Sequence, residues 1–238
     1  MSLLQDAAQT PVEPHPLDIP AWASLTGAHR HLALVHGRAA RYLPDVSPFG
    51  VVAPDPDART WADQEALVGH DAVLPLAAVE VTPPAGFTME MSLQGVQMID
   101  ASVDAVTDPE AVRLTAADVP EMLDLVARTR PGPFERRTIE LGTYLGIRRD
   151  GVLVAMAGER MHPPGHTEIS AVCTDPAHRG HGLAARLVRA VAAGIRARGE
   201  TPFLHAAATN TGAIALYEKL GFVLRKTTTF GAIRTPST

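Results

Sequence analysis

The chain has 238 residues, of which 46% are hydrophobic and 20% charged, a length and composition that suit a soluble globular protein of one or two domains. The formal net charge of -5 argues against a broad nucleic-acid-binding surface. One cysteine, no signal-peptide pattern and no run of 18 apolar residues together predict a cytoplasmic protein without a disulfide or membrane span.

The first part of the chain predicts a small α/β unit. Four prolines in residues 1–20 indicate an extended leader. Apolar side chains at three- and four-residue spacing predict a helix over residues 22–41, and a second helix is expected to be capped by Thr60 and stopped by Gly69. Strands are expected at 49–53, 72–81 and 87–99. This part contains no phosphate loop and no cluster with metal-ligand spacing.

The hydrophobic signal weakens over residues 100–112, where we place a domain boundary. The expected division is a leader at 1–20, a small α/β domain without a phosphate loop at 21–105, and a second domain at 111–238. The second domain should start with a helix capped by Thr115 and continue with a hairpin that turns at Asp150-Gly151. The elements expected after it are a strand at 167–175, a helix at 183–198, a strand at 202–209, a helix at 211–220 and a strand at 222–230.

A glycine turn stands between the strand at 167–175 and the amphipathic helix after it, in the order Arg179-Gly180-His181-Gly182. The first N–H groups of a helix are unpaired, and its dipole places partial positive charge there. Glycines let an anion approach the backbone, so the turn predicts a phosphate or pyrophosphate site. A P-loop would need a lysine and a dinucleotide fingerprint a third glycine, and neither is present. A glycine turn without a ligand remains the alternative.

Two segments together resemble the GNAT superfamily of N-acetyltransferases. Arg179, Gly182 and Ala184 fit its acyl-CoA loop, Arg/Gln-x-x-Gly-x-Gly/Ala. Residues 210–222, "NTGAIALYEKLGF", match its pattern Asn-x-x-Ala-x-x-Leu-Tyr-x-x-x-Gly-Phe at every defined position. The resemblance covers about residues 114–230. The residues of the loop and the long N-terminal extension also resemble those of the branch related to glycine N-acyltransferase.

The resemblance implies an α/β fold, an α+β mixed sheet in which two strands splay apart to admit the pantetheine arm. The C-terminal half would be the GNAT acyltransferase fold, and residues 21–105 a smaller, degenerate copy that covers the acceptor site or serves only as a structural partner. The implied activity is direct transfer of an acetyl group from acetyl-CoA, as cosubstrate and without a metal, to a primary amine. The alternative is an acyl-CoA-binding regulatory module without catalysis. The expected partner is a small-molecule or amino-acid-like amine, with no nucleic acid or membrane, and a homodimer is left open.

Tyr217 is the expected catalytic acid, because in the family a tyrosine at this position protonates the departing thiolate. The alternative is a core tyrosine. Glu168 is the first candidate for the base that deprotonates the amine, and Glu159 is the second; either could be a solvated carboxylate at a strand end. His162 and His166 are expected at the surface but stay open as bases. Cys173 is expected to be a small buried residue rather than a nucleophile.

Asn210 has two compatible roles, as a helix cap and as a partner of pantetheine. The backbone near Cys173 could pair with pantetheine and polarise the thioester carbonyl. The residues that the resemblance implies for CoA binding are Ala171, Val172, Cys173, His178, Arg179, Gly180, His181, Gly182, Leu183, Ala184, Asn210, Ala213 and Tyr217.

Overall fold

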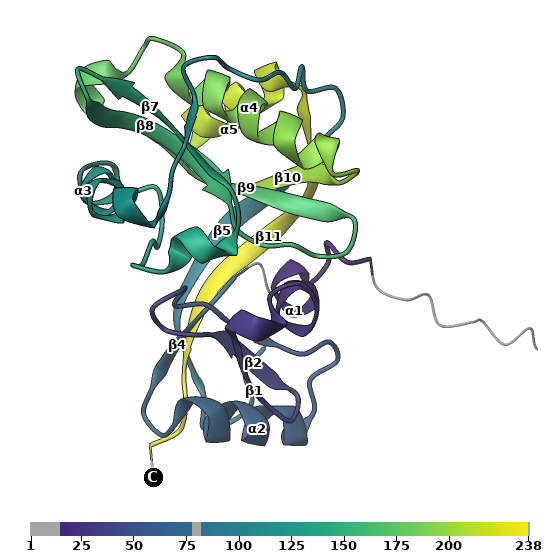
Figure 1. Ribbon diagram of the computed structural model, residues 1–238. Helices are drawn as coiled ribbons and strands as arrows, with labels where there is room; N and C mark the ends of the chain where they lie inside the picture. The colour runs from purple at the N-terminus through teal and green to yellow at the C-terminus, as the bar shows by residue number, and fades with distance from the viewer. Residues whose placement is uncertain (1–14, 78–81, 238) are drawn as a thin grey trace, which may run out of the picture.

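The computed structural model describes residues 15–77 and 82–237. Its strands form one mixed sheet in the order β1-β2-β3-β4-β11-β5-β10-β9-β8-β7-β6 (Figure 1). The strands are β1 (Ala33–His36), β2 (Ala39–Tyr42), β3 (Gly50–Val52), β4 (Val73–Leu76), β5 (Thr88–Asp100), β6 (Val112–Arg113), β7 (Tyr144–Arg149), β8 (Val152–Glu159), β9 (His166–Thr174), β10 (Thr201–Ala207) and β11 (Phe222–Arg234).

The sheet has two halves, named by their place in Figure 1: the upper half contains β6 to β10 and the lower half contains β1 to β4. Helices cover the sheet in both halves. The helices are α1 (Pro20–Thr26), α2 (Ala58–Val68), α3 (Val119–Thr129), α4 (Leu183–Ala197) and α5 (Thr211–Leu220). In the upper half α4 and α5 build one apolar core and α3 builds another, while α1 and α2 pack in the lower half. None of the described helices is long and apolar enough to cross a membrane.

Strands β5 and β11 run through both halves as a thirteen-residue antiparallel pair (Figure 1). In the upper half β5 also pairs with β10, from Gly95 to Ile99, and in the lower half β11 pairs with β4. The two domains proposed from the sequence therefore share one sheet. Because β5 precedes the proposed boundary at 105–111 in the chain, it supplies a central strand to the domain that follows that boundary.

The expected splay is present between β9 and β10. These parallel strands pair from His166 and Thr201 to Ile169 and Leu204, and β9 then continues to Thr174 without pairing to β10. Ala171 has a φ of +52° at an irregularity in the pairing of β9 with β8, which turns β9 away from β10. The splay confirms the mixed GNAT-type sheet and leaves backbone groups of β9 free at its edge.

The helix expected at residues 22–41 is wrong over most of its length. Helix α1 ends at Thr26, and β1 and β2 form a hairpin that turns at Gly37, whose φ is +52°. Thr60 is not the cap of α2, because the Asp57 carboxylate accepts the Thr60 N–H at 2.8 Å and Thr60 lies inside the first turn. Residues 1–14 of the expected leader lie outside the described residues.

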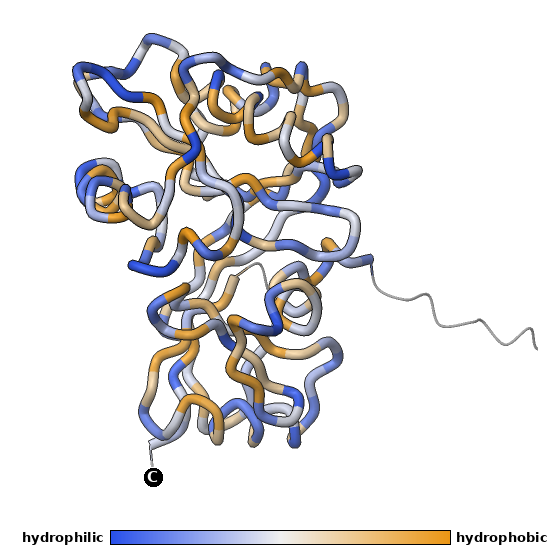
Figure 2. The backbone as a smooth tube through the Cα atoms, in the orientation of Figure 1, coloured by the Kyte–Doolittle hydropathy of each residue, from blue (hydrophilic) through white to orange (hydrophobic). Residues whose placement is uncertain are grey.

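The later elements agree closely with the sequence expectations. The β7–β8 hairpin turns at Asp150-Gly151, both with positive φ, and Figure 2 shows this turn as hydrophilic beside the hydrophobic strand β8. Helix α5 ends at Gly221, as expected. A short 3-10 turn, Ala116–Asp118, stands between Thr115 and α3, and the last strand continues past residue 230 to Arg234.

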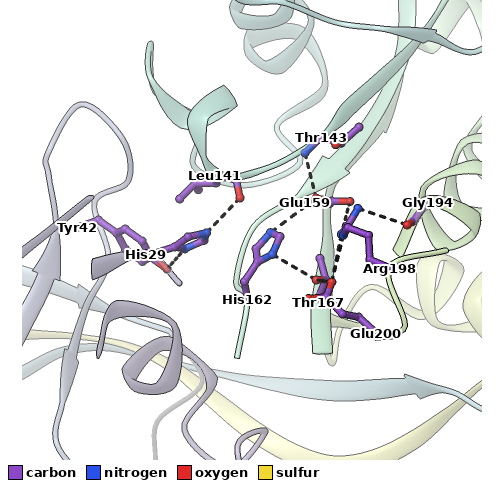
Figure 3. A network of polar contacts seen from close by, with 10 residues as sticks. All are labelled: His29, Tyr42, Leu141, Thr143, Glu159, His162, Thr167, Gly194, Arg198 and Glu200. Carbon is purple, nitrogen blue, oxygen red and sulfur yellow. Dashed lines mark hydrogen bonds and ion pairs between the residues drawn. The ribbon is translucent and has the colours of Figure 1, made fainter. Parts of the chain in front are cut away.

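A buried polar network joins the two halves (Figure 3). His29 is 4% exposed and lies with Nδ1 3.0 Å from the Tyr42 hydroxyl and Nε2 3.1 Å from the Leu141 carbonyl oxygen. A neutral ring satisfies both contacts, because Nε2–H donates to the carbonyl while Nδ1 accepts from the hydroxyl. The ring of His162 lies 4.9 Å from that of His29. Burial, and then repulsion from His162, lower the pKa of His29 to about 4.

Candidate active site

A cleft of about 1100 Å³ runs from the glycine turn to the lower half of the sheet. Its upper end is lined by His178, Arg179, Gly180, Gly182, Leu183, Ala184, Asn210, Ala213 and Tyr217. Its lower end is lined by Pro48, Phe49, Pro75, Leu76, Met91, Leu93, Arg160, His205 and Phe230. Residues 171–173 of the splayed strand line it as well. The cleft thus brings together residues from distant parts of the chain.

The glycine turn presents open backbone at the start of α4. Gly180 and Gly182 have φ values of +81° and +72°, and a Cβ on either would meet no atom within 4 Å. Gly182 is the N-cap residue of α4, and no side chain caps the helix there. The first N–H groups of α4 are therefore free to bind an anion, and the helix dipole favours negative charge at this point.

The basic residues of the turn differ in position. Arg179 lines the cleft, and its Nε donates to the Thr174 carbonyl oxygen at 3.3 Å, which holds the side chain beside the turn. His178 also lines the cleft. His181 is exposed and is not among the lining residues, and its Nδ1 lies 3.2 Å from the His178 carbonyl oxygen. Of the histidines expected at the turn, the structure therefore brings only His178 to the cleft wall.

Cys173 contributes to the cleft as part of the splayed strand. Its side chain belongs to the core under α3 and is 7% exposed. Burial raises the pKa of its thiol to about 11, so the thiolate needed for nucleophilic attack is scarce at neutral pH. This placement agrees with the expectation of a small buried residue.

Tyr217 lines the upper end from the middle of α5. Its side chain packs against Phe222, and burial raises its pKa to about 12, so the hydroxyl keeps its proton at neutral pH. The hydroxyl makes no hydrogen bond to any described residue. The start of α5 is fixed by Asn210, whose Oδ1 accepts the Ala213 N–H at 3.2 Å. The Tyr217 hydroxyl thus lines the cleft in its protonated form, and the capping role of Asn210 is confirmed.

Glu168 is fully buried and is not among the residues that line the cleft. Its carboxylate accepts two hydrogen bonds from Arg160, at 2.7 and 2.6 Å, and its Oε1 lies 2.7 Å from Nδ1 of His205. Burial by itself would raise the pKa of Glu168, but the charge and hydrogen bonds of Arg160 and His205 outweigh it and lower the pKa to about 2. A carboxylate held in this way is a poor base.

Glu159 also lies outside the set of lining residues. One of its oxygens accepts the Thr143 N–H at 3.0 Å, and the other pairs with Arg198 at 2.9 Å. His162 lies beside it in the network between the halves (Figure 3), and His166 contacts the Pro164 carbonyl oxygen. The structure therefore brings neither of the two expected carboxylates, nor either histidine, to the cleft.

The lower end contains residues that the sequence analysis did not select. Arg160 and His205 line it and hold the buried Glu168 between them. Nε2 of His205 lies 3.1 Å from the amide nitrogen of Gln97, whose oxygen accepts from Arg225 at 2.9 Å. Since Glu168 accepts from Nδ1–H and Gln97 donates to Nε2, both ring nitrogens of His205 are occupied. No local motif marks these residues, because their positions in the chain are far apart.

Comparison with known proteins agrees with this geometry. Residues 144–230 match the family model described as FR47-like protein. The N-alpha-acetyltransferase RimI of Mycobacterium tuberculosis is 33% identical over 130 residues, which is 50% of this chain and 81% of the relative. A crystal structure from Novosphingobium aromaticivorans, assigned to the GNAT family of acetyltransferases, is 43% identical with a TM-score of 0.85, over 94% of this chain and 100% of that one.

A GCN5-related N-acetyltransferase from Kribbella flavida shares the fold at 18% identity, with a TM-score of 0.58 over 92% of this chain and 96% of that one. The expected placement near glycine N-acyltransferase stays a prediction. The glycine turn at the start of α4, the splay of β9 from β10 and the tyrosine of α5 are the features that the resemblance in the sequence implies. The chain therefore belongs to the GNAT family of acetyltransferases.

Proposed function

We propose that the protein transfers an acetyl group from acetyl-CoA directly to a primary amine. The observation that carries this proposal is that the open glycine turn, the splayed edge of β9 and the Tyr217 hydroxyl all line one cleft. The RimI relative is named an N-alpha-acetyltransferase, which supports an amine as the acceptor. We include in the proposal a cytoplasmic location and a small-molecule or amino-acid-like acceptor.

The donor binds at the upper end of the cleft. Its pyrophosphate sits on the free N–H groups at the start of α4, where Gly180 and Gly182 leave room and Arg179 adds positive charge. The pantetheine amides pair with the unpaired edge of β9 over residues 171–173. This arrangement places the thioester between that edge and Tyr217, where a backbone N–H can polarise the carbonyl.

The transfer proceeds when the neutral amine attacks the thioester carbon. A C–N bond forms, the tetrahedral intermediate collapses, and the C–S bond breaks to release CoA. Tyr217 donates its proton to the departing sulfur, for which its high pKa and free hydroxyl suit it. The ammonium formed on the acceptor nitrogen loses its proton to solvent, and Tyr217 is reprotonated from solvent.

The amine enters the cleft already neutral in this mechanism. No Asp or Glu of residues 15–77 or 82–237 lines the cleft, and Glu168 is held as an ion pair behind the wall. Both nitrogens of His205 are engaged. Neither Glu168 nor Glu159 therefore acts as the base, and the proton of the amine is lost to water instead. Turnover should then rise with pH until the pH reaches the pKa of the acceptor amine.

The lower half of the chain supplies one wall of the acceptor site. Phe49 and Leu76 lie before the proposed domain boundary, and both line the cleft. These positions support the covering role for residues 21–105 over the role of a purely structural partner. Residues 21–77 and 82–105 contain no second glycine turn of the kind found at α4.

The test is calorimetric titration with acetyl-CoA, together with CoA release in the presence of primary amines. Gly182→Asp should weaken binding roughly 100-fold or more, because charge-assisted hydrogen bonds of about 1.5–3 kcal/mol each are lost. Gly199→Asp is the matched control, since Gly199 also has positive φ, +78°, and open space around it, but lies past the other end of α4.

Equal affinity of the folded Gly182→Asp protein and wild type would contradict the proposed donor site. If wild type binds acetyl-CoA but releases no CoA with any amine, catalysis is wrong and the chain is an acyl-CoA-binding module.

A further inference from the structure

The lower end of the cleft combines apolar walls with one fixed guanidinium. The walls come from three strands, β4, β5 and β11, and from the loop before β3, and they are formed by Pro48, Phe49, Pro75, Leu76, Met91, Leu93 and Phe230. Arg160 lies among them, directly after β8, with its side chain 15% exposed. A ligand bound there would meet hydrocarbon on most sides and hydrogen-bond donors at one point.

Arg160 is held in one orientation. Its Nε and Nη2 donate to the two oxygens of Glu168, which is fully buried, and its guanidinium carbon lies 5.4 Å from the centre of the Phe49 ring. Nη1 makes no hydrogen bond to any described residue and is not enclosed by protein. The guanidinium therefore keeps N–H groups free at the cleft wall, in a position that needs no further ordering.

Arg160 lies close to the part of β9 where the reacting groups are proposed to bind. Its backbone N–H donates to the Glu168 carbonyl oxygen at 3.0 Å, so it lies beside β9 just before the splayed residues 171–173. The proposed thioester lies along that splayed edge. A ligand that reaches from the thioester toward Arg160 thus places its amine at the edge and another group on the guanidinium.

We propose that Arg160 binds an oxygen on the carbon next to the acceptor's amine-bearing carbon, and that the apolar walls hold the acceptor's hydrocarbon side chain. This inference rests on the proposed acetyl transfer and specifies its acceptor as an α-amine with a neighbouring carboxylate or amide carbonyl. The charge pattern supports it, because Arg130, Arg160 and Arg179 line the cleft while no acidic side chain of the described residues does. A polyamine or aminoglycoside would need carboxylates there.

The experiment compares kcat/KM for leucine, leucinamide and 3-methylbutylamine, which carry the same branched hydrocarbon. Leucine represents a free amino acid, leucinamide represents a peptide N-terminus, and 3-methylbutylamine lacks the oxygen. The three amines differ in basicity, so the decisive quantity is how a variant changes their ratios, since basicity then cancels. The variant is Arg160→Lys, which keeps a positive charge beside Glu168 and removes the planar fork.

In wild type we expect an oxygen-bearing amine to be preferred over 3-methylbutylamine. Arg160→Lys should reduce that preference by about 10- to 100-fold, the value of a charge-assisted hydrogen bond, chiefly through KM. Arg196→Lys is the matched control, because Arg196 also pairs with a carboxylate, that of Asp100, but lies outside the cleft. It should leave the ratio unchanged. Whether leucine or leucinamide is favoured tells a free amino acid from a peptide terminus.

The proposal is overturned if 3-methylbutylamine is used as well as the other two amines, or if Arg160→Lys leaves the ratios as they are. It is also overturned if acetyl-CoA is bound and other amines are acetylated but leucine and leucinamide are not. If Arg160→Lys does not fold, the test uses wild type alone. Leucinamide and 3-methylbutylamine are then compared as competitive inhibitors of any amine that is turned over, and leucinamide should inhibit at lower concentration. Failure of acetyl-CoA to bind at all contradicts the proposed function itself.

Discussion

The two ends of the cleft are built in different ways. At the upper end, the groups that face the ligand are largely backbone N–H groups, exposed at the start of α4 by Gly180 and Gly182 and along β9 by its splay. At the lower end they are side chains, fixed by a buried chain of contacts in which Glu168 joins Arg160 to His205. The upper end therefore suits a ligand that stays the same from one acceptor to another, which is the donor. Single substitutions can alter the lower end without loss of the donor site.

The largest effect is expected from removing residues 1–110, which include β5 and the part of the cleft wall formed by Phe49 and Leu76. A chain of residues 111–238 lacks β5, which pairs with both β10 and β11, and it loses the buried Met98 from the upper core. We expect it not to fold. A chain of residues 87–238 keeps β5 and should retain measurable acetyl-CoA binding. Circular dichroism and calorimetry compare the two.

If residues 111–238 alone fold and bind acetyl-CoA as tightly as the full chain, then β5 is dispensable and the domain boundary proposed from the sequence is correct as drawn.

Tyr217→Phe tests whether the proton for the departing thiolate comes from the upper end of the cleft. The ring and its packing against Phe222 are kept while the donor is removed, so turnover should fall by roughly 10- to 10⁴-fold with little change in acetyl-CoA affinity. Tyr144→Phe is the matched control, since Tyr144 is also buried but does not line the cleft. Steady-state kinetics with any accepted amine measures both. Wild-type turnover in Tyr217→Phe would assign the proton to water or another group.

Glu168→Gln tests whether the lower end also stabilises the fold. The substitution leaves the mostly buried Arg160 charge without its fully buried partner, which should lower the free energy of unfolding by about 3 kcal/mol, near the low end for a buried pair because Arg160 reaches the cleft. Glu121→Gln removes a carboxylate from an exposed pair with Arg148 and should cost less than about 1 kcal/mol. Urea unfolding gives both values. Similar small losses for the two variants would show that the buried pair contributes no more than a surface pair.

The smallest effect concerns pH and the network between the halves. Because the pKa of His29 is about 4 in the folded chain and near 6.5 when unfolded, the unfolded chain binds more protons between these values. Stability is therefore full above pH 6.5 and falls as the pH drops toward 4, by up to about 3 kcal/mol. In Figure 3 the groups around His29 are His162, Tyr42 and the Leu141 carbonyl, and Glu159 lies on the far side of His162 from His29.

His29→Gln should flatten this dependence, although the variant is less stable at pH 7. Urea unfolding at pH 7, 5.5 and 4 measures the difference from wild type. His36→Gln, at an exposed histidine, is the matched control. Equal slopes in wild type and His29→Gln would show that another group is responsible for the acid sensitivity.

The contrast between the two ends also explains what the sequence could predict. The glycine turn, the Asn210 cap and the Asp150-Gly151 hairpin each depend on neighbouring residues, so short patterns identified them. The environment of Glu168 depends on Arg160, eight residues away, and on His205, 37 residues away. A carboxylate at a strand start looks the same in sequence whether it faces solvent or is buried in an ion pair.

The helix predicted at residues 22–41 is wrong at the β1–β2 hairpin because this hairpin also depends on distant residues. Its strands have four residues each, too few for a period of two to be distinguished from a period near three and a half. What holds them in the sheet is pairing with β3, and beyond it β4 and β11, and these partners lie up to about 200 residues away.

The long β5–β11 ladder, which has two irregularities in its register, sets how the molecule can open. Both strands run from one half into the other, so a swing of one half against the other would have to bend the whole hydrogen-bonded pair. Local opening of the ladder amides therefore requires most of the free energy of global unfolding, and these amides should be among the slowest to exchange with deuterium in either half. Entry and exit of ligands then fall to segments outside the ladder, such as the turn at residues 129–133 that borders the cleft.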